Sequence, residues 1–395
     1  MKRAYVTTFF TCACVLALFF LFSRLFHFNE AMSTVNVGFI YEGDESAPYT
    51  YNFSRAEVML QEEYRDSVKI YTKNNVPDDD MEDTLRELAA KDCSIIFTNN
   101  HSDQFAAVAP LFPDIQICQI SDLKSTPEQY PGNYHTFNGR LYELRYVSGV
   151  AAGLKLKEMI DSGEISPQQA IVGYVGTFPV ASVISGYTAF LIGIRSIVPE
   201  AVMKVKYTYT WAEYKEEKDC ARDLIKAGCV VLSQHSDTIG PAVACEEASL
   251  EQPVVFVGCS KSLLDTAPRS ALLSIRVNWS SYVLEAVSAV RNHKKIEDVV
   301  SGNKNGNDVS AGYAQGALEF LDLNKNLLQE DVGPILENAV RTVKEDPAAA
   351  YRGAYTGTDP NDPSDSINLE KGYIENANSS APSFHYLLKD VIEVI

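Results

Sequence analysis

Short apolar runs and segments with an apolar residue every three or four positions alternate along most of the chain. The short runs predict buried strands, and the periodic segments predict helices with one apolar face. In the first half of the chain, strands are expected at 35–41, 68–71, 94–98, 116–120 and 134–137, with helices at 56–64, 81–92 and 102–111. This alternation is typical of βαβ units and mostly parallel sheets.

The same alternation of short apolar runs and periodic segments returns after residue 170. Strands are expected at 170–175, 203–209, 229–232, 254–257 and 272–277, with helices at 182–197, 215–227, 239–248 and 280–293. Two successive series of this kind predict two similar α/β lobes. A further helix is expected at 327–345, after a turn-rich connection.

One helix stands where the first series ends and the second begins. Leu141, Leu144, Val147 and Leu154 recur at helical spacing, and the pattern predicts a helix over 138–154 with Asn138 as its N-cap. This helix is expected to lie at a hinge between the lobes, and a surface helix of one large sheet is the alternative.

The N-terminal segment has the layout of a targeting sequence. Lys2 and Arg3 precede an uncharged, mostly apolar run over 4–22. A run of this length just spans a bilayer, and the preceding basic residues favour a cytoplasmic N-terminus. We expect residues 1–28 to act as an uncleaved signal anchor that holds the body on the extracytoplasmic face of the membrane. A cleaved signal peptide and a lipoprotein are the alternatives.

Charge and cysteine content narrow the function classes. The net charge is −18, and −21 without the three basic residues of the N-terminal segment. Such a surface repels nucleic acid, so no nucleic-acid partner is expected. Six cysteines beyond that segment fall in strand or helix patterns without metal-binding spacing, and we expect them to be buried free thiols. No metal or cofactor is expected.

Polar and aromatic residues follow the expected strands. Ligands of parallel α/β sheets bind outside the carboxyl ends of the strands. Aromatic faces with amides and carboxylates suit a flat heterocycle held by stacking and hydrogen bonds. For each single residue, a packing or capping role is the alternative. The candidate ligand-binding residues are Tyr51, Asn52, Asn100, His101, Phe178, Trp211, Gln234, Asp237 and Ser260.

At these positions the chain resembles the basic membrane protein family, the purine-nucleoside-binding proteins of ABC importers. The run NGRLYELRYVSGVAAG over 138–153 is similar to the family's hinge-helix motif. The segments 173–180, 210–211, 234–237 and 278–279 also follow in the family's order. The resemblance covers about 35–300 and is strongest over 134–237.

The resemblance implies a type I periplasmic-binding-protein fold, with two Rossmann-like lobes joined by three crossings. We expect lobe 1 to comprise 34–137 and 261–300, and lobe 2 to comprise 138–260 and 308–345, followed by a C-terminal extension over 346–395. By the same resemblance, Tyr51 and Trp211 stack on a base from opposite lobes.

Two departures from the family affect the ligand. Ser260 stands where an acidic residue would hold ribose hydroxyls, and Ala47-Pro48 replaces acidic or amide residues in the first loop. A nucleobase, or another small heterocycle related to the purines, is therefore expected nearly as much as a nucleoside.

The expected function is capture of such a purine for an ABC permease and its ATPase, without enzymatic activity. The alternatives are a membrane-tethered ligand sensor without a transport role and, less favoured, a nucleoside hydrolase. No phosphate-binding loop or nucleophile elbow is present in the sequence.

Overall fold

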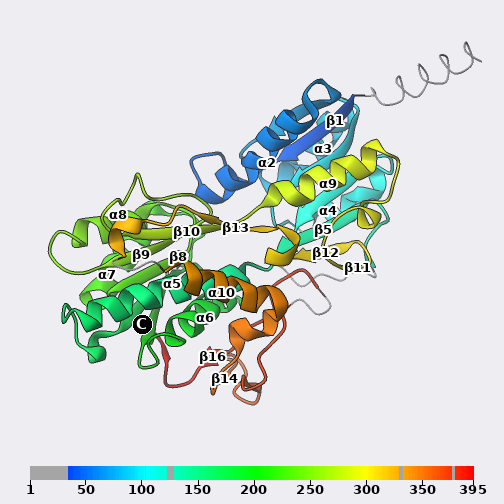
Figure 1. The fold of residues 1–395 in the computed structure, drawn as a ribbon. Coiled ribbons are helices and arrows are strands. Elements are labelled where there is room, and N and C mark those ends of the chain that lie inside the picture. Colours follow the sequence, from blue (N-terminus) through cyan, green and yellow to red (C-terminus); the bar gives the residue numbers. More distant parts are fainter. Residues whose placement is uncertain (1–33, 103, 122–128, 329–331, 376–378) are drawn as a thin grey trace, which may run out of the picture.

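The computed structural model describes residues 34–102, 104–121, 129–328, 332–375 and 379–395. The predicted signal anchor lies outside the described residues. Among the described helices, none is both long and apolar enough to cross a membrane. The chain forms two lobes, each built on a seven-stranded sheet (Figure 1). The predicted α/β fold with mostly parallel sheets is confirmed.

Lobe 1 has the strand order β11-β12-β5-β4-β3-β1-β2. All its neighbouring strands are parallel except the edge pair β11 and β12. The strands are β1 (Val35–Ile40), β2 (Val68–Lys73), β3 (Cys93–Thr98), β4 (Gln116–Ile120), β5 (Tyr134–Gly139), β11 (Asn303–Asn305) and β12 (Asp308–Ala311). The helices are α2 (Pro48–Tyr64), α3 (Met81–Ala89), α4 (Gln104–Val108) and α9 (Trp279–Arg291).

Lobe 2 has the strand order β13-β10-β9-β8-β6-β7-β17, with β13 antiparallel at one edge. Its strands are β6 (Ile171–Gly176), β7 (Val202–Tyr207), β8 (Val231–His235), β9 (Val255–Cys259), β10 (Ala271–Val277), β13 (Leu318–Leu321) and β17 (Ile392–Val394). Its helices are α5 (Leu141–Asp161), α6 (Ala181–Arg195), α7 (Tyr214–Lys226), α8 (Gly240–Ala248) and α10 (Gly333–Glu345).

The predicted lobe boundaries were wrong at two strands. β10 was assigned to lobe 1, but it pairs in parallel with β9 in the sheet of lobe 2. β12 was assigned to lobe 2, but it pairs in parallel with β5 in lobe 1. The chain therefore enters lobe 1 for the second time only after β10, where α9 packs on α2.

The hinge helix begins three residues later than predicted. Asn138 is not its N-cap but belongs to β5, and its side chain donates to the carbonyl of Ser121. The strand continues through Gly139 because β12 pairs with it there. Arg140 occupies the cap position, and the helix runs from Leu141.

The chain crosses between the lobes three times: from β5 to α5, from β10 to α9, and from β12 to β13. The crossings lie against one another. The amide of Arg140 donates to the carbonyl of Ala311 at 2.8 Å, and the amide of Asn278 donates to the carbonyl of Ala317 at 2.8 Å. This arrangement is the three-crossing hinge that the sequence predicted.

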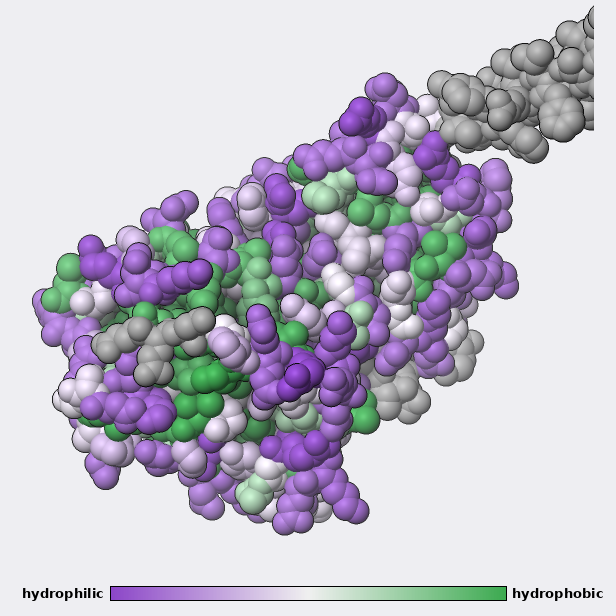
Figure 2. Space-filling model, viewed as in Figure 1, coloured by the Kyte–Doolittle hydropathy of each residue, from purple (hydrophilic) through white to green (hydrophobic). Residues whose placement is uncertain are grey.

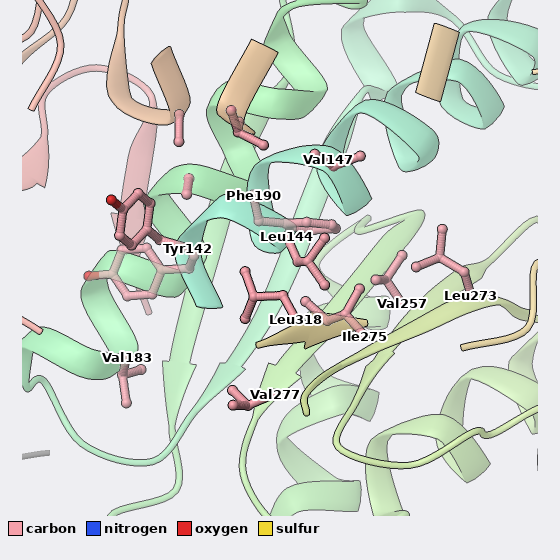
Figure 3. Packing of buried hydrophobic residues seen from close by; sticks show 14 of the residues in the cluster. Tyr142, Leu144, Val147, Val183, Phe190, Val257, Leu273, Ile275, Val277 and Leu318 are labelled. Carbon is pink, nitrogen blue, oxygen red and sulfur yellow. The ribbon is translucent and has the colours of Figure 1, made fainter. Parts of the chain in front are cut away.

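Helix α5 is buried against its own lobe. Tyr142, Leu144 and Val147 are all buried, and Leu144 lies beside Ile275 and Leu318 of the neighbouring strands (Figure 3). On its other side α5 approaches α6 closely, because a Cβ at Gly149 would lie 2.1 Å from the carbonyl oxygen of Phe190. The packing fixes α5, and with it the hinge, to lobe 2.

The C-terminal extension belongs to lobe 2 (Figure 1). Its last strand, β17, pairs in parallel with β7. A small sheet precedes it, with β14 (Thr356–Thr358) between β15 (Ser366–Asn368) and β16 (Leu387–Leu388). The extension also reaches lobe 1, since the amide of Ser380 donates to Asp308 Oδ2 at 2.6 Å.

The hydropathy of the surface and the burial of the cysteines agree with the composition of the chain. The face shown in Figure 2 is largely hydrophilic, with hydrophobic residues gathered mainly over lobe 2. All six cysteines of the described part are free thiols. Five are buried and Cys259 is half-buried, which confirms the predicted thiols and their burial in all but one case.

Candidate ligand-binding cleft

A cavity lies between the lobes, at the carboxyl ends of their strands, with about 770 Å³ of empty space when the open solvent at its mouth is included. Lobe 1 and the crossings contribute Glu42, Tyr49, Asn52, His101, Val277 and Trp279, and lobe 2 contributes Leu141, Arg145, Trp211, Ala212, His235, Ser236, Asp237, Cys259 and Ser260. Five of the nine predicted residues therefore meet in this cavity: Asn52, His101, Trp211, Asp237 and Ser260.

Aromatic rings from both lobes face one another in the cavity. The rings of Tyr49 and His101 lie 6.1 Å apart and nearly parallel, at 23°. The ring of His101 also faces that of Trp211, at 6.5 Å and 26°. Lobe 1 supplies the first two rings and lobe 2 supplies the third, so the three faces meet across the boundary between the lobes.

Tyr49, and not the predicted Tyr51, supplies the ring from α2. The sequence predicted a loop up to residue 55, but α2 begins at Pro48, whose fixed φ suits a first helical position. On a helix, residues three apart share a face, and Tyr49 and Asn52 both line the cavity. Tyr51 points elsewhere, and Lys261 Nζ of lobe 2 lies 4.7 Å from the centre of its ring.

Trp211 lies on the loop after β7 and is 46% exposed. A large, exposed indole at the mouth of a cavity is available to cover a ligand. The ring of Phe178 packs against it at 5.4 Å and 53°. Phe178 does not line the cavity, and its contact with Trp211 indicates a supporting role.

Asp237 connects the lobes directly. The amide of Tyr49 donates to Asp237 Oδ1 at 2.6 Å. The amide of Asp237 donates to the carbonyl of Trp211 at 3.0 Å, which ties the two residues together. Burial raises the pKa of the Asp237 carboxyl to about 7, and the negative charges of Glu217 and Glu42 add to this. Near neutral pH this carboxyl can therefore both donate and accept.

Two predicted polar residues make internal contacts and do not line the cavity. Asn100 accepts from the amide of Ser102 at 2.7 Å and donates to the carbonyl of Val76. Gln234 Nε2 donates to the carbonyls of Ser236 and Thr238, both at 2.8 Å. Both side chains hold strand-end loops in place.

Asn52 and Ser260 both lie in the cavity wall. Asn52 is distinguished by a hydrogen bond to a backbone carbonyl, and Ser260 by its own backbone conformation. Asn52 is buried and donates to the carbonyl of Val277 at 3.0 Å, which ties α2 to the second crossing. Ser260 has a φ of 67°, a left-handed conformation that costs a non-glycine residue about 1–2 kcal/mol. Strained residues of this kind concentrate at functional sites.

A second cavity of about 560 Å³ adjoins the first and runs toward the hinge. Tyr49, Leu141, Arg145, His235, Val277 and Trp279 line both cavities. Gly186 of α6 and Glu375 of the C-terminal extension line the second one only. Arg145 and His235 were not among the ligand-binding residues predicted from sequence, although Arg145 lies in the conspicuous 138–153 motif.

Burial gives the charged and polar groups of this region unusual properties. Arg145 is fully buried, and its terminal nitrogens donate to Ser233 Oγ at 3.2 Å and to the carbonyl of Gln234 at 2.9 Å. Burial, together with the charge of Arg145, lowers the pKa of His235 to about 3, so this imidazole is neutral at pH 7. Burial also raises the pKa of Glu375 to about 7.

Within the described ranges, one group of side chains is spaced closely enough to hold a metal ion. It consists of Asp359, Asp365 and His385. These residues belong to the C-terminal extension and not to the cleft. His385 Nε2 lies 3.2 Å from Asp365 Oδ2 and 3.8 Å from Asp359 Oδ2.

Two lobes that flank a shared cavity and are joined by three crossings have the architecture of a substrate-binding protein of the periplasmic type. The sequence profile of the family described as PnrA-like ABC transporter substrate-binding proteins matches residues 34–345. The chain belongs to this family, which confirms the resemblance seen in the sequence. Its members bind small molecules and work with a membrane permease.

Similar proteins differ in what their names say they bind. A purine-binding protein of Brucella abortus is 28% identical over 265 residues, which cover 66% of this chain and 70% of that protein. A Haloferax volcanii protein, named for glucose binding in an ABC transporter, is 27% identical over 55% of this chain. The match spans about half, 52%, of that relative's length.

The fold has solved counterparts. A solute-binding protein of an ABC transporter system from Aeropyrum pernix is 15% identical and has a TM-score of 0.64. The match covers 79% of this chain and 92% of that one. At this identity the likeness concerns the fold alone.

Proposed function

We propose that this protein captures a purine base or nucleoside outside the cytoplasm and presents it to an ABC permease. The observation that carries the proposal is the set of facing rings, Tyr49 and His101 from one lobe and Trp211 from the other. A planar heterocycle stacks on such faces, and each face contributes roughly 1–3 kcal/mol to holding a base.

The edge of the ring needs polar partners. Asp237 lies beside Trp211, and a carboxyl with a pKa near 7 pairs with the donor and acceptor pattern of a purine edge. The name of the Brucella abortus relative agrees with a purine. The Haloferax volcanii relative makes glucose the ligand to exclude.

The sugar of a nucleoside is expected to add little. Ser260 supplies one hydroxyl where the family resemblance implies an acid for the ribose. We therefore propose that adenine or guanine binds within about tenfold of its nucleoside, a difference below about 1.4 kcal/mol.

Calorimetry tests the proposal directly. The protein is titrated with adenine, guanine, hypoxanthine, their nucleosides and glucose. Purines are expected to bind and glucose is not. Tight binding of glucose, with purines inert, would overturn the purine assignment.

Scattering provides a second measurement. Ligand that bridges the lobes favours the closed state, so the radius of gyration is expected to fall on saturation. A tightly bound purine that leaves the scattering profile unchanged would contradict closure, though not binding.

The proposal includes attachment to the membrane through residues 1–28, with the body outside. Protease added to intact cells is expected to remove the body, and its resistance until the membrane is permeabilised would refute this topology. The sensor alternative predicts that the protein has no permease partner. In that case, cells with and without the protein would take up purines equally. Release of free base from a nucleoside would reveal the hydrolase alternative.

A further inference from the structure

A small polar niche lies beside Gly186, a residue that lines the second cavity. A Cβ on this glycine would lie 3.3 Å from His235 Nδ1, 3.3 Å from Tyr174 Oη and 3.5 Å from Arg145 Nε. The three atoms come from three different elements, β8, β6 and α5. The niche exists because residue 186 has no side chain.

None of these three atoms has a hydrogen-bond partner within the part of the chain that the structure describes. All three are buried, and Arg145 is 0% exposed. Buried polar atoms are paired in most proteins, so three unpaired atoms around one point need an explanation. A ligand atom that completes the three bonds is such an explanation.

The chemistry of the niche favours an acceptor. A guanidinium nitrogen can only donate, and Arg145 forms no ion pair with any carboxylate of the described residues. The Tyr174 hydroxyl stays protonated because burial raises its pKa, and it can rotate to donate. The neutral imidazole of His235 can carry its proton on Nδ1. A ligand oxygen would satisfy all three groups.

A further donor lies nearby. Trp279 Nε1, which can only donate, also has no partner among the described residues. Trp279, Arg145 and His235 line both cavities. A ring between the aromatic faces therefore meets a donor-rich surface on its hinge side, while Asp237 lies beside Trp211.

We propose that this niche binds the exocyclic oxygen of a 6-oxopurine, so that the protein prefers hypoxanthine or guanine to adenine. The inference rests on the proposed purine function and specifies its ligand class. Adenine would place an amino group, itself a donor, against the donors of the niche. Leaving buried donors unpaired in this way weakens binding roughly tenfold to a hundredfold.

The test compares hypoxanthine with adenine on the full chain, by calorimetry, in the wild type and in Gly186→Ala. Hypoxanthine is expected to bind at least tenfold tighter to the wild type. The added methyl group fills the niche, so the preference is expected to fall to within about threefold in the variant. Alanine is favoured over glycine inside a helix, and folding of the variant is checked by circular dichroism.

Gly132→Ala is the matched control, because a Cβ there meets nothing within 4 Å. It is expected to keep the wild-type preference. Equal or tighter binding of adenine to the wild type would overturn the inference. So would a preference for hypoxanthine that Gly186→Ala leaves unchanged.

Two further results distinguish a site for the base oxygen from a site for the ribose and from the absence of purine binding. Inosine and adenosine are titrated as a second pair. A loss of affinity in Gly186→Ala that affects both nucleosides equally and spares both bases would assign the niche to the ribose and refute the base oxygen. Absence of binding by any purine to the wild type would refute the proposed function itself, and the inference with it.

Discussion

Two buried arginines, five residues apart, show the difference between the hinge and the cleft. Arg140 pairs with Glu143 at 2.6 Å and donates to Gln315 at 3.1 Å. Glu143 also accepts from the amide of Tyr313 at 2.8 Å. Arg145 is buried still more deeply, but among the described residues it has no carboxylate partner and its Nε is unpaired.

The hinge pair of Arg140 and Glu143 thus has its partners without a ligand. The pair of Arg140 and Glu143 joins the first crossing to the third, and a Cβ at Gly312 would lie 2.3 Å from both side chains. The cleft keeps unpaired donors, facing rings and a strained serine. Burial alone therefore does not mark a functional residue. The hydrogen-bond partners of a buried arginine separate a structural one, such as Arg140, from a candidate for ligand binding, such as Arg145.

Breaking the hinge pair should have the largest effect. Glu143→Ala leaves Arg140 buried without its partner, and we expect the free energy of unfolding to fall by roughly 3–5 kcal/mol. Urea denaturation measures the free energy of unfolding of each variant. Asp161→Ala is the control, because it removes the exposed pair with Lys157 and should cost less than about 1 kcal/mol. Equal losses in both variants would contradict the structural role of the hinge pair.

Removing an aromatic face of the cleft should affect binding and spare folding. Trp211→Ala and Tyr49→Ala are each expected to weaken purine binding by roughly 1–3 kcal/mol, or about ten- to a hundredfold. Tyr51→Ala is the matched control, since this ring lies outside the cavity lining. Calorimetry decides, and a larger loss for Tyr51→Ala than for Tyr49→Ala would restore the assignment made from sequence.

The pH dependence of stability should identify the buried carboxyl of the cleft. The Asp237 pKa is about 7 in the folded protein, against an ordinary value of 3.8. Between these values the folded protein holds a proton that the unfolded chain has released. Stability therefore falls as pH rises through this window, by at most about 1.4 kcal/mol per pH unit for one group.

Asp237→Asn should reduce this slope, measured as denaturation midpoints from pH 4 to pH 7.5. It should not abolish the slope, because Glu375 has a similarly raised pKa and contributes with the same sign. Asp219→Asn is the control, since this carboxyl is exposed and its pKa is lowered by hydrogen bonding to Lys215. An unchanged slope in Asp237→Asn would mean that this carboxyl is ionised throughout the window.

The sequence predicted what depends on local periodicity. The alternation of strands and helices, the two lobes and the crossing at 138–141 all leave a pattern in the chain. The sequence pattern does not tell to which lobe β10 belongs, because an apolar strand of this length can pair in either sheet. Its position depends on β9 and β13, which are neighbours in space.

The site was predicted in part, for a similar reason. His101, Trp211 and Asp237 follow strands, and strand ends meet at the cleft. Tyr49 was missed because the segment before residue 56 lacks a clear apolar period, so the early start of α2 was not evident. Arg145 was missed because its partners, Ser233 and Gln234, are 88 and 89 residues away.

The smallest expected effect concerns Ser260, whose φ of 67° distinguishes it from neighbouring residues of the cleft. Glycine adopts this conformation without steric cost, so Ser260→Gly should relieve strain of about 1 kcal/mol or more, partly offset by the greater freedom of an unfolded glycine. We expect a net gain in the free energy of unfolding of a few tenths to about 1 kcal/mol, measured by urea denaturation. Ser262→Gly is the matched control, because Ser262 is not among the residues with positive φ and should lose about 0.5–1 kcal/mol. A loss in Ser260→Gly as large as in the control would show that contacts of the hydroxyl outweigh the strain. A gain in stability with weaker purine binding would instead show that the strain holds a ligand-binding hydroxyl in place.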